Sequence, residues 1–307
     1  MAQAEIPLRE GLGLRLRLRL RRLGRFLQAH PLSAVGLLFL AVLGGVAVFA
    51  PYLSPYDPEA VVGKPFQKPS PQHPLGTNDI GQDILSELIY GARTSLLIGF
   101  TAAAIAILLG TLVGVVAGYA GGWVDAALMR LVDVVLVIPF LPLMILLAAY
   151  LGPGLLNIIG VIAALIWARP ARVIRSQVLS LRHAAYIEAA EALGASFGRV
   201  LLRHVLPGVL PLALAQFILA ASSSILIESS LAFLGLGDPL RKSWGTILYY
   251  AQARGAFLTG AWLWWVLPPG LLITLSVLGF ALTGYALETL VQPQLARHGG
   301  GRRSPTP

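Results

Sequence analysis

Long apolar stretches without a charged side chain dominate this sequence and restrict its fold more than any other feature. One covers residues 33–50, and another covers residues 94–119. About 18 consecutive apolar residues are enough for a helix to cross the hydrocarbon core of a bilayer. Only 12% of the residues are charged, whereas soluble domains contain about 25%. We therefore expect an all-α integral membrane protein.

The apolar stretches and the polar segments between them predict six transmembrane helices. The first stands apart, because a long polar segment follows it, and the other five fall within a core domain at residues 93–291. The predicted spans cover residues 33–50, about 94–119, about 124–150, about 155–168, about 209–235 and about 266–290.

Glycines and prolines give two of the predicted spans particular shapes. Gly110, Gly114 and Gly118 repeat every four residues in the second span. This spacing places them on one helix face, which a second helix can approach closely. Pro139 and Pro142 interrupt the third span, and a kink is expected there.

Residues 51–92 are expected to form an extracytoplasmic loop, because the segment is polar and rich in proline. Near its end, Asn78 or Asp79 can cap a short helix that carries Ile84 and Leu88 on one side. This helix is predicted to lie along the outer membrane surface.

A second outer loop is expected at residues 238–265. It contains Trp262, Trp264 and Trp265, which are typical of the aromatic belt where a protein meets the bilayer interface.

The basic residues predict the orientation of the chain. Placing both termini and the loops at residues 121–130 and 169–208 in the cytoplasm puts 17 of the 23 Lys and Arg residues inside, as the positive-inside rule requires. The chain is thus expected to cross the cytoplasmic membrane several times, with the lipid bilayer as its main surroundings. Nucleic-acid binding is not expected, because the sequence has no soluble domain in which basic residues are interleaved with aromatic ones.

Both ends of the chain are predicted to be basic cytoplasmic segments. Residues 1–32 contain seven arginines between Arg9 and Arg25, and residues 292–307 form a short basic tail. Two interpretations of the first segment stay open. It can be an interfacial helix beside anionic head groups, or a basic tail that only sets the orientation.

The charged residues of the third span suggest local roles. Arg130 and Asp133 are one helical turn apart and can pair with each other, and a structural ion pair or snorkelling is favoured over a functional role. Asp125 lies at the cytoplasmic boundary, where it is expected to help start the span.

A polar segment at residues 175–208 separates the fourth and fifth spans. It contains Glu188-Ala189-Ala190, three further residues, Gly194 and, later, Leu206-Pro207. This pattern matches the EAA signature of ABC-importer permeases. The resemblance implies a short coupling helix that docks into a groove on a separate ATPase subunit.

The residue types in this segment suit a docking helix. Ile187 can contribute with its neighbours to an apolar docking face, Gly194 can end the helix with a left-handed cap, and Phe197 can begin a second helix. Glu188 can pair with a basic residue of the partner. An ordinary amphipathic surface helix with solvated glutamates is the alternative. The residues assigned to coupling are Tyr186, Glu188, Ala189, Ala190, Leu193, Gly194, His204, Leu206 and Pro207.

Three further segments, at residues 76–100, 118–140 and 233–248, resemble the C-type permease of dipeptide, oligopeptide and nickel importers. The resemblance covers about residues 30–290 and implies the type I ABC-importer permease fold. It also implies a second homologous permease subunit, two ATPase subunits, an extracytoplasmic solute-binding protein and a peptide substrate. The chain departs from the family at Gly208, where an asparagine is usual, and at Glu228-Ser229-Ser230.

Glu228 lies deep in the fifth span and allows two interpretations. It can belong to a polar stripe along the translocation path, or it can hold two helices together through hydrogen bonds. A proton relay through Glu228 would instead favour a proton-coupled secondary transporter, which is the alternative function. The residues of the possible path are Ser222, Ser223, Glu228 and Ser229.

Several classes of site are excluded by the sequence. The chain contains no cysteine, and its five histidines are too scattered for a metal site. It has no GxxxxGK[ST] phosphate-binding loop, so it is not expected to be an enzyme or to hold a cofactor. ATP and Mg²⁺ are expected to bind to the partner subunits.

Overall fold

The computed structural model describes residues 31–291, with side-chain surroundings for residues 31–284. Regular structure in this part of the chain is helical, and the only β pairing within it is an isolated bridge between Thr77 and Asp83. This confirms the all-α prediction. Residues 1–30 of the basic segment predicted at residues 1–32, and the predicted tail at residues 292–307, lie outside the described residues.

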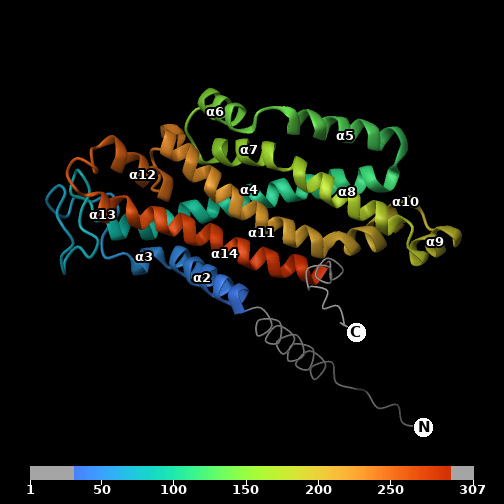
Figure 1. Ribbon diagram of the computed structural model, residues 1–307, viewed down its shortest axis with the longest axis horizontal. Helices are drawn as coiled ribbons and strands as arrows, with labels where there is room; N and C mark the ends of the chain where they lie inside the picture. The colour runs from blue at the N-terminus through green and yellow to red at the C-terminus, as the bar shows by residue number, and fades with distance from the viewer. Residues whose placement is uncertain (1–30, 292–307) are drawn as a thin grey trace, which may run out of the picture.

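The helices form an elongated bundle whose long members run along one axis (Figure 1). Four helical stretches are long and apolar enough to cross a membrane, and the number rises to six if each of two bent pairs is one span. The helices are α2 (Pro31–Val48), α3 (Ala50–Leu53), α4 (Ile84–Ala120), α5 (Gly122–Val137), α6 (Phe140–Leu151), α7 (Leu155–Ile166), α8 (Ala168–Arg182), α9 (Ala185–Ala192), α10 (Phe197–Val200), α11 (Leu206–Leu231), α12 (Trp244–Ala253), α13 (Trp262–Trp265) and α14 (Leu267–Val291).

Helix α4 is one continuous helix of 37 residues. The carboxylate of Asp83 caps it by accepting hydrogen bonds from the backbone N–H of Ser86 at 2.9 Å and from the Ser86 hydroxyl at 2.8 Å. The separate outer-surface helix capped by Asn78 or Asp79 is therefore a wrong prediction. Asn78 instead closes a turn by accepting from the N–H of Gln82, and α4 crosses the domain boundary predicted after residue 92.

The glycine stripe of α4 packs directly against α8, as its spacing predicts. A Cβ atom at Gly110 would lie 2.8 Å from the carbonyl oxygen of Trp167, and one at Gly114 would lie 2.6 Å from that of Ala171. Gly118 is equally close to the side chain of Val178. The two backbones therefore approach to a distance that only glycine permits.

Helices α5 to α8 form two bent pairs. Helices α5 and α6 meet at an angle of 87°, and α7 and α8 meet at 41°. The first break falls where predicted, because Ile138 is extended before Pro139, as the residue before a proline prefers. Helix α8 also continues well past the predicted end of the fourth span, so much of the segment at residues 169–208 is packed helix.

Ion pairs join α5 to α8. Arg175 donates to both carboxylate oxygens of Asp125 at 2.5 Å, and Arg172 donates to Asp133 at 2.6 Å. The predicted local pair between Arg130 and Asp133 is therefore wrong, because the partner of Asp133 comes from α8. Asp125 does lie in the first turn of α5, as expected.

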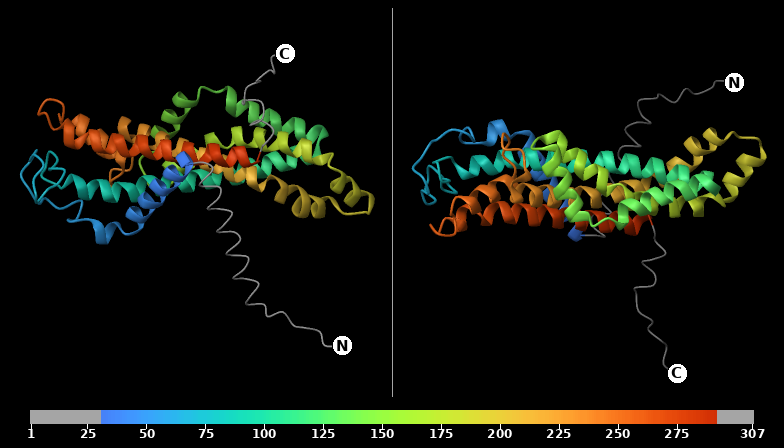
Figure 2. Two further views of the ribbon diagram at one scale, coloured as in Figure 1. Left: turned by 60° about the horizontal axis from the view of Figure 1, so that its bottom comes forward. Right: turned by 90° about the horizontal axis from the view of Figure 1, so that it is seen from above.

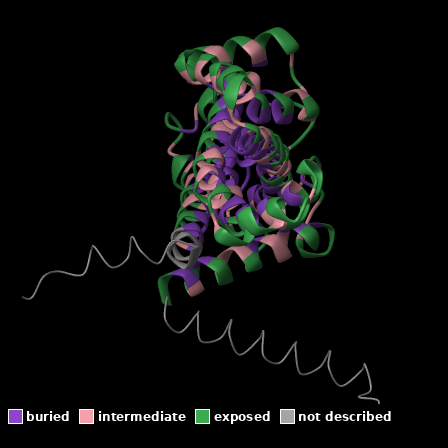
Figure 3. Cartoon of the chain, turned by 90° about the vertical axis from the view of Figure 1, so that its right-hand side faces the viewer, coloured by how far each residue is buried: buried purple, intermediate pink, exposed green. Residues whose placement is uncertain are grey.

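The core lies where α4 packs on α8 and α11, and where α11 packs on α14. Figure 3 shows buried residues at the centre of the bundle and exposed residues around it. Many large apolar side chains nevertheless point outward, among them Leu108, Leu146 and Leu214. Such an apolar outer surface suits a protein whose surrounding solvent is lipid.

The second outer loop folds back onto the bundle through α12. This helix begins with a reciprocal capping box between Ser243 and Thr246. Trp264 and Trp265 are buried nearby, and the ring of Trp265 meets that of Phe66 edge to face at 6.0 Å. The prediction of an aromatic belt is wrong for these two tryptophans, which hold the two outer loops together, whereas Trp262 is exposed.

Candidate functional site: the coupling segment and two cavities

The segment with the EAA pattern projects from one end of the bundle. Helices α9 and α10 lie beyond the other helices there, and the outer loops gather at the opposite end (Figures 1 and 2). A single π-helical turn at Leu201–Val205 joins α10 to α11, so the segment continues directly into a membrane-spanning helix.

Gly194 ends α9 with the predicted left-handed cap. Its φ is +80°, a value that glycine adopts without the steric penalty of a Cβ atom. The N–H of Gly194 donates to the carbonyl of Glu191 at 2.9 Å, and the N–H of Ala195 donates to that of Ala190 at 3.0 Å. These bonds satisfy the last carbonyls of the helix and turn the chain toward α10.

Two contacts hold α9 against the end of the bundle. The side chain of Ile187 is fully buried in the main core cluster. The hydroxyl of Tyr119, near the end of α4, donates to Oε1 of Glu191 at 2.6 Å, and its ring lies 4.8 Å from that of Phe197. Ile187 therefore anchors α9 to its own subunit, and its predicted place on the docking face is wrong.

The remaining surface of α9 is open to solvent. Leu193 is 89% exposed and Tyr186 is 50% exposed, and Glu188, Ala189 and Pro207 are also exposed. Ala190, His204 and Leu206 are partly buried, and the ring of His204 lies 6.2 Å from that of Tyr186. The structure thus brings the predicted coupling residues to one end of the molecule. Their role in docking stays a prediction.

Two exposed residues beside this surface were not assigned from the sequence. Phe197 is 52% exposed and Leu202 is 63% exposed, and both follow Gly194 within one or two helical turns. The available signal was that these large apolar side chains alternate with Arg199 and Arg203 in a polar segment.

Most of the residues predicted for the translocation path pack between helices. Glu228 is buried and accepts hydrogen bonds from the hydroxyls of Ser95 at 3.2 Å and Ser229 at 3.3 Å. The Ser95 hydroxyl also accepts from the backbone N–H of Trp244, so this network ties α4, α11 and α12 together. The geometry favours the helix-bonding interpretation of Glu228.

Ser222 and Ser223 differ in their surroundings. Ser222 is buried and donates to the carbonyl of Val277 on α14 at 3.2 Å. Ser223 is exposed and lines a cavity between helices. Of the four predicted path residues, the structure therefore places Ser223 at an open space and the other three in helix packing.

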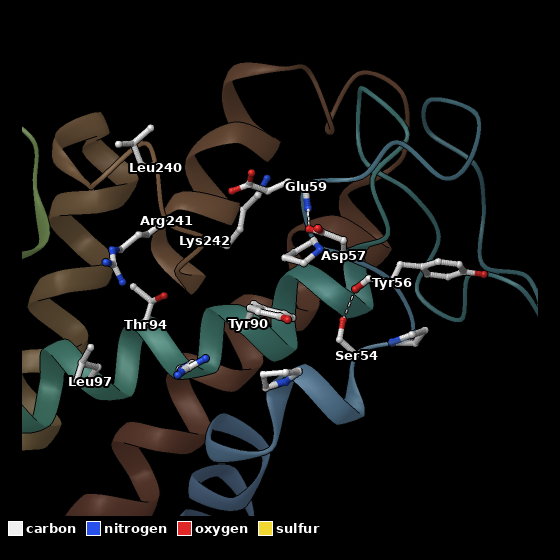
Figure 4. A pocket seen from close by; sticks show the side chains of 14 residues that line it. Ser54, Tyr56, Asp57, Glu59, Tyr90, Thr94, Leu97, Leu240, Arg241 and Lys242 are labelled. Carbon is white, nitrogen blue, oxygen red and sulfur yellow. Dashed lines mark hydrogen bonds between the residues drawn. The ribbon is translucent and has the colours of Figure 1, made fainter.

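The end of the bundle opposite to α9, where the two predicted outer loops lie, holds the larger cavity, of about 830 Å³. Figure 4 shows side chains from α4, from the loop after α3 and from the segment before α12 around it. Its lining mixes acids at Asp57 and Glu59 with bases at Arg93 and Arg241. Such a cavity presents charges of both signs at the end opposite to α9.

A buried polar network fixes one wall of this outer cavity. Nζ of Lys242 donates to Oε1 of Glu87 at 2.7 Å and to Oε1 of Gln82 at 2.9 Å. The amide of Asn78 also donates to Glu87. Paired in this way, the buried charges are compensated, and the first outer loop is held to the segment before α12.

Comparison with known proteins shows the family. Residues 110–297 match the model of the binding-protein-dependent transport system inner membrane component, and residues 19–74 match the N-terminal TM domain of oligopeptide transport permease C. A dipeptide transport system permease protein of Alkalihalophilus pseudofirmus is 37% identical over 271 residues, which are 88% of this chain and 88% of the relative.

Two further relatives show similar agreement. A glutathione transport system permease protein of Pectobacterium atrosepticum is 35% identical over 88% of this chain and 89% of its own length. A di/tripeptide transport system permease protein of Pseudomonas aeruginosa is 38% identical over 87% of this chain and 90% of its own length. The chain belongs to the family of binding-protein-dependent transport system inner membrane components, the membrane-spanning permease subunits of ABC importers.

Proposed function

We propose that this chain forms half of the translocation pathway of a peptide importer, and that α9 couples it to an ATPase subunit. The exposed surface around Leu193 at the projecting end of the bundle carries this proposal. A strongly apolar residue that is 89% exposed outside the apolar bundle is poorly suited to water, and a partner that covers it removes that cost.

The proposed complex contains a second homologous permease subunit, two ATPase subunits and an extracytoplasmic solute-binding protein. The partner permease completes the pathway, and the ATPase subunits bind ATP and Mg²⁺, so this chain needs no cofactor of its own. The end with α9 faces the cytoplasm, as do both termini, and the outer cavity faces the binding protein. This orientation agrees with the positive-inside rule.

The fold offers a helical route between the two ends. One helical stretch, Phe197–Leu236, begins beside α9 and reaches the outer loops. At its far end Glu228 is bonded to Ser95 of α4, which in turn is bonded to the start of α12. A displacement of α9 by the ATPase subunits therefore moves α11 and the outer segment together, which suits a switch between inward-facing and outward-facing states.

Peptides are the proposed cargo, because relatives over most of the chain are named as permeases for dipeptides, di- and tripeptides or glutathione. The proton-coupled alternative rests on Glu228 alone. This side chain is enclosed among serine hydroxyls and is 1% exposed, which is a position suited to joining helices.

Uptake into vesicles tests the proposal. We expect the chain, assembled with the permease, ATPase and binding-protein subunits encoded with it, to import a labelled dipeptide only when ATP and the binding protein are both present. Uptake that proceeds without ATP and follows an imposed pH gradient would instead support the proton-coupled transporter and contradict the proposal.

A further inference from the structure

An inner cavity of about 470 Å³ lies where the break between α5 and α6, the bend between α7 and α8, and helix α11 meet. Most of its lining is apolar, and its polar side chains are Arg169, Gln216 and Ser223. Its size falls within the usual range of small-molecule sites, about 300–1,000 Å³, which are typically apolar with a few polar groups.

Arg169 differs from the next two arginines of α8, which form ion pairs with α5. Arg169, Arg172 and Arg175 follow one another on α8 at a spacing of three residues. The second pairs with Asp133 and the third with Asp125. The residues that α5 and α6 contribute to the cavity beside Arg169 are apolar, Leu136 and Phe140 among them. Within residues 31–284, no ion pair of Arg169 is found.

Arg169 is exposed in this chain, so an anion from outside the chain can reach it. Its guanidinium stays charged at any physiological pH, and charged side chains inside membrane-spanning segments usually mark the path of a substrate or ion. For Arg172 and Arg175, the partner is an aspartate of α5 in the same subunit. Since Arg169 has no such acidic partner within residues 31–284, we infer that its anionic partner comes from outside the chain.

Helix α11 extends the polar surface of the cavity toward the outer end of the bundle. Gln216, Ser223 and Ser230 repeat every seven residues, so they lie on one face of the helix. Ser223 and Ser230 are exposed and Gln216 is partly so. The hydroxyls of Ser223 and Ser230 donate to carbonyls one turn earlier in the helix. Their oxygens can still accept hydrogen bonds, which suits a wall of a water-filled passage.

We propose that Arg169, Gln216 and Ser223 form a subsite that receives the C-terminal carboxylate of a peptide as it passes through this subunit. The inference rests on the proposed function and names residues that select the cargo. A guanidinium matches a carboxylate through two parallel N–H···O bonds. The amide of Gln216 supplies a further donor. The hydroxyl of Ser223 donates to the carbonyl of Leu219 at 3.1 Å, so its oxygen can accept from an N–H of the peptide, and the apolar lining accommodates a side chain of the peptide.

The test compares a dipeptide that has a free C-terminus with the same dipeptide amidated, in vesicles that contain the full complex. We expect Arg169→Met to lower uptake of the free acid by about tenfold or more, the effect of losing a charge-assisted bond, and to leave uptake of the amide unchanged. Arg169→Lys should restore part of the lost preference. Affinity of the binding protein for both peptides is measured separately, and their uptake is corrected for it.

Arg130→Met is the matched control, because it also removes an exposed positive charge but lies outside the cavity. It should leave the preference for the free acid unchanged. Equal effects of Arg169→Met on both peptides would overturn the subsite. Loss of complex assembly in Arg169→Met would also overturn it, because Arg169 would then pair with a partner subunit. So would a wild-type preference for the free acid that disappears when anionic lipid is left out of the vesicles. Absence of any ATP-driven uptake in the wild type would refute the proposed function itself.

Discussion

Gly194→Pro is expected to abolish ATP-driven uptake while the bundle still folds and inserts. Proline fixes φ near −65°, whereas residue 194 requires +80°. It also removes the N–H that donates to the carbonyl of Glu191. Helix α9 would lose its end geometry, and Leu193 would no longer point as it does in the native chain. Uptake and ATPase activity stimulated by the binding protein, both in vesicles, measure the effect.

Glycine substitutions that differ only in backbone geometry provide the controls. A Cβ atom meets nothing within 4 Å at either Gly194 or Gly198. Only Gly194 has a positive φ, so Gly194→Ala should be impaired by a strain of about 1–2 kcal/mol and Gly198→Ala should transport normally. Glu188→Lys, at an exposed position, should also abolish uptake. Full uptake by Gly194→Pro or by Glu188→Lys would contradict the coupling role of α9.

Gly114→Leu is expected to destabilise the subunit strongly. The added Cβ atom would lie 2.6 Å from the carbonyl oxygen of Ala171 and 3.1 Å from the backbone nitrogen of Arg175. Both atoms belong to the backbone of α8 and cannot rotate away, so α4 and α8 must separate. We expect the free energy of unfolding to fall by about 3 kcal/mol or more, the upper end of over-packing effects. Thermal unfolding of the purified protein in detergent measures this loss.

Gly160→Leu is the matched control on α7. It introduces the same side chain at an exposed helical glycine where a Cβ atom meets nothing within 4 Å. Its stability should stay within about 0.5 kcal/mol of the wild type. If the two variants unfolded at the same temperature, the close packing of α4 on α8 would not stabilise the fold.

The membrane spans could be predicted from the sequence because lipid imposes a simple requirement on length and polarity. The glycine stripe at Gly110, Gly114 and Gly118 and the break at Pro139 were also predictable, since each acts through local backbone geometry. The cap of α9 at Gly194 belongs to the same class. In each case the residue type restricts the conformation of its own segment.

Features that depend on distant partners could not be predicted. Asn78, Asp79 and Asp83 can all cap a helix, and the burial of Asp83 beside His73, with 2.9 Å between Nδ1 and Oδ1, distinguishes it. Asp133 pairs with Arg172 on α8, although Arg130 is closer in sequence. The side chain of Ile187 looks like part of a docking face until α9 folds against the end of α4.

The buried tryptophans and Glu228 show the same limit. Trp264 resembles an interface residue by type, but the first outer loop covers it, and Gly76 approaches its ring so closely that a Cβ atom would lie 3.0 Å away. A glutamate at position 228 can line a translocation path or join two helices through hydrogen bonds, and its residue type fits both roles equally well. Only the position of Ser95 on a helix that is 133 residues earlier in sequence distinguishes these roles.

Cross-linking from a single site tests the coupling role of α9 most directly. The chain contains no cysteine, so Leu193→Cys gives one attachment point for a photoreactive cross-linker at the tip of α9. Tyr52→Cys provides the control, because Tyr52 is 87% exposed and follows the first span at the outer end. In the assembled complex, we predict that an ATPase subunit is captured from position 193 and not from position 52. Capture of the ATPase subunit from position 52, with none from position 193, would contradict both the docking site and the orientation of the chain.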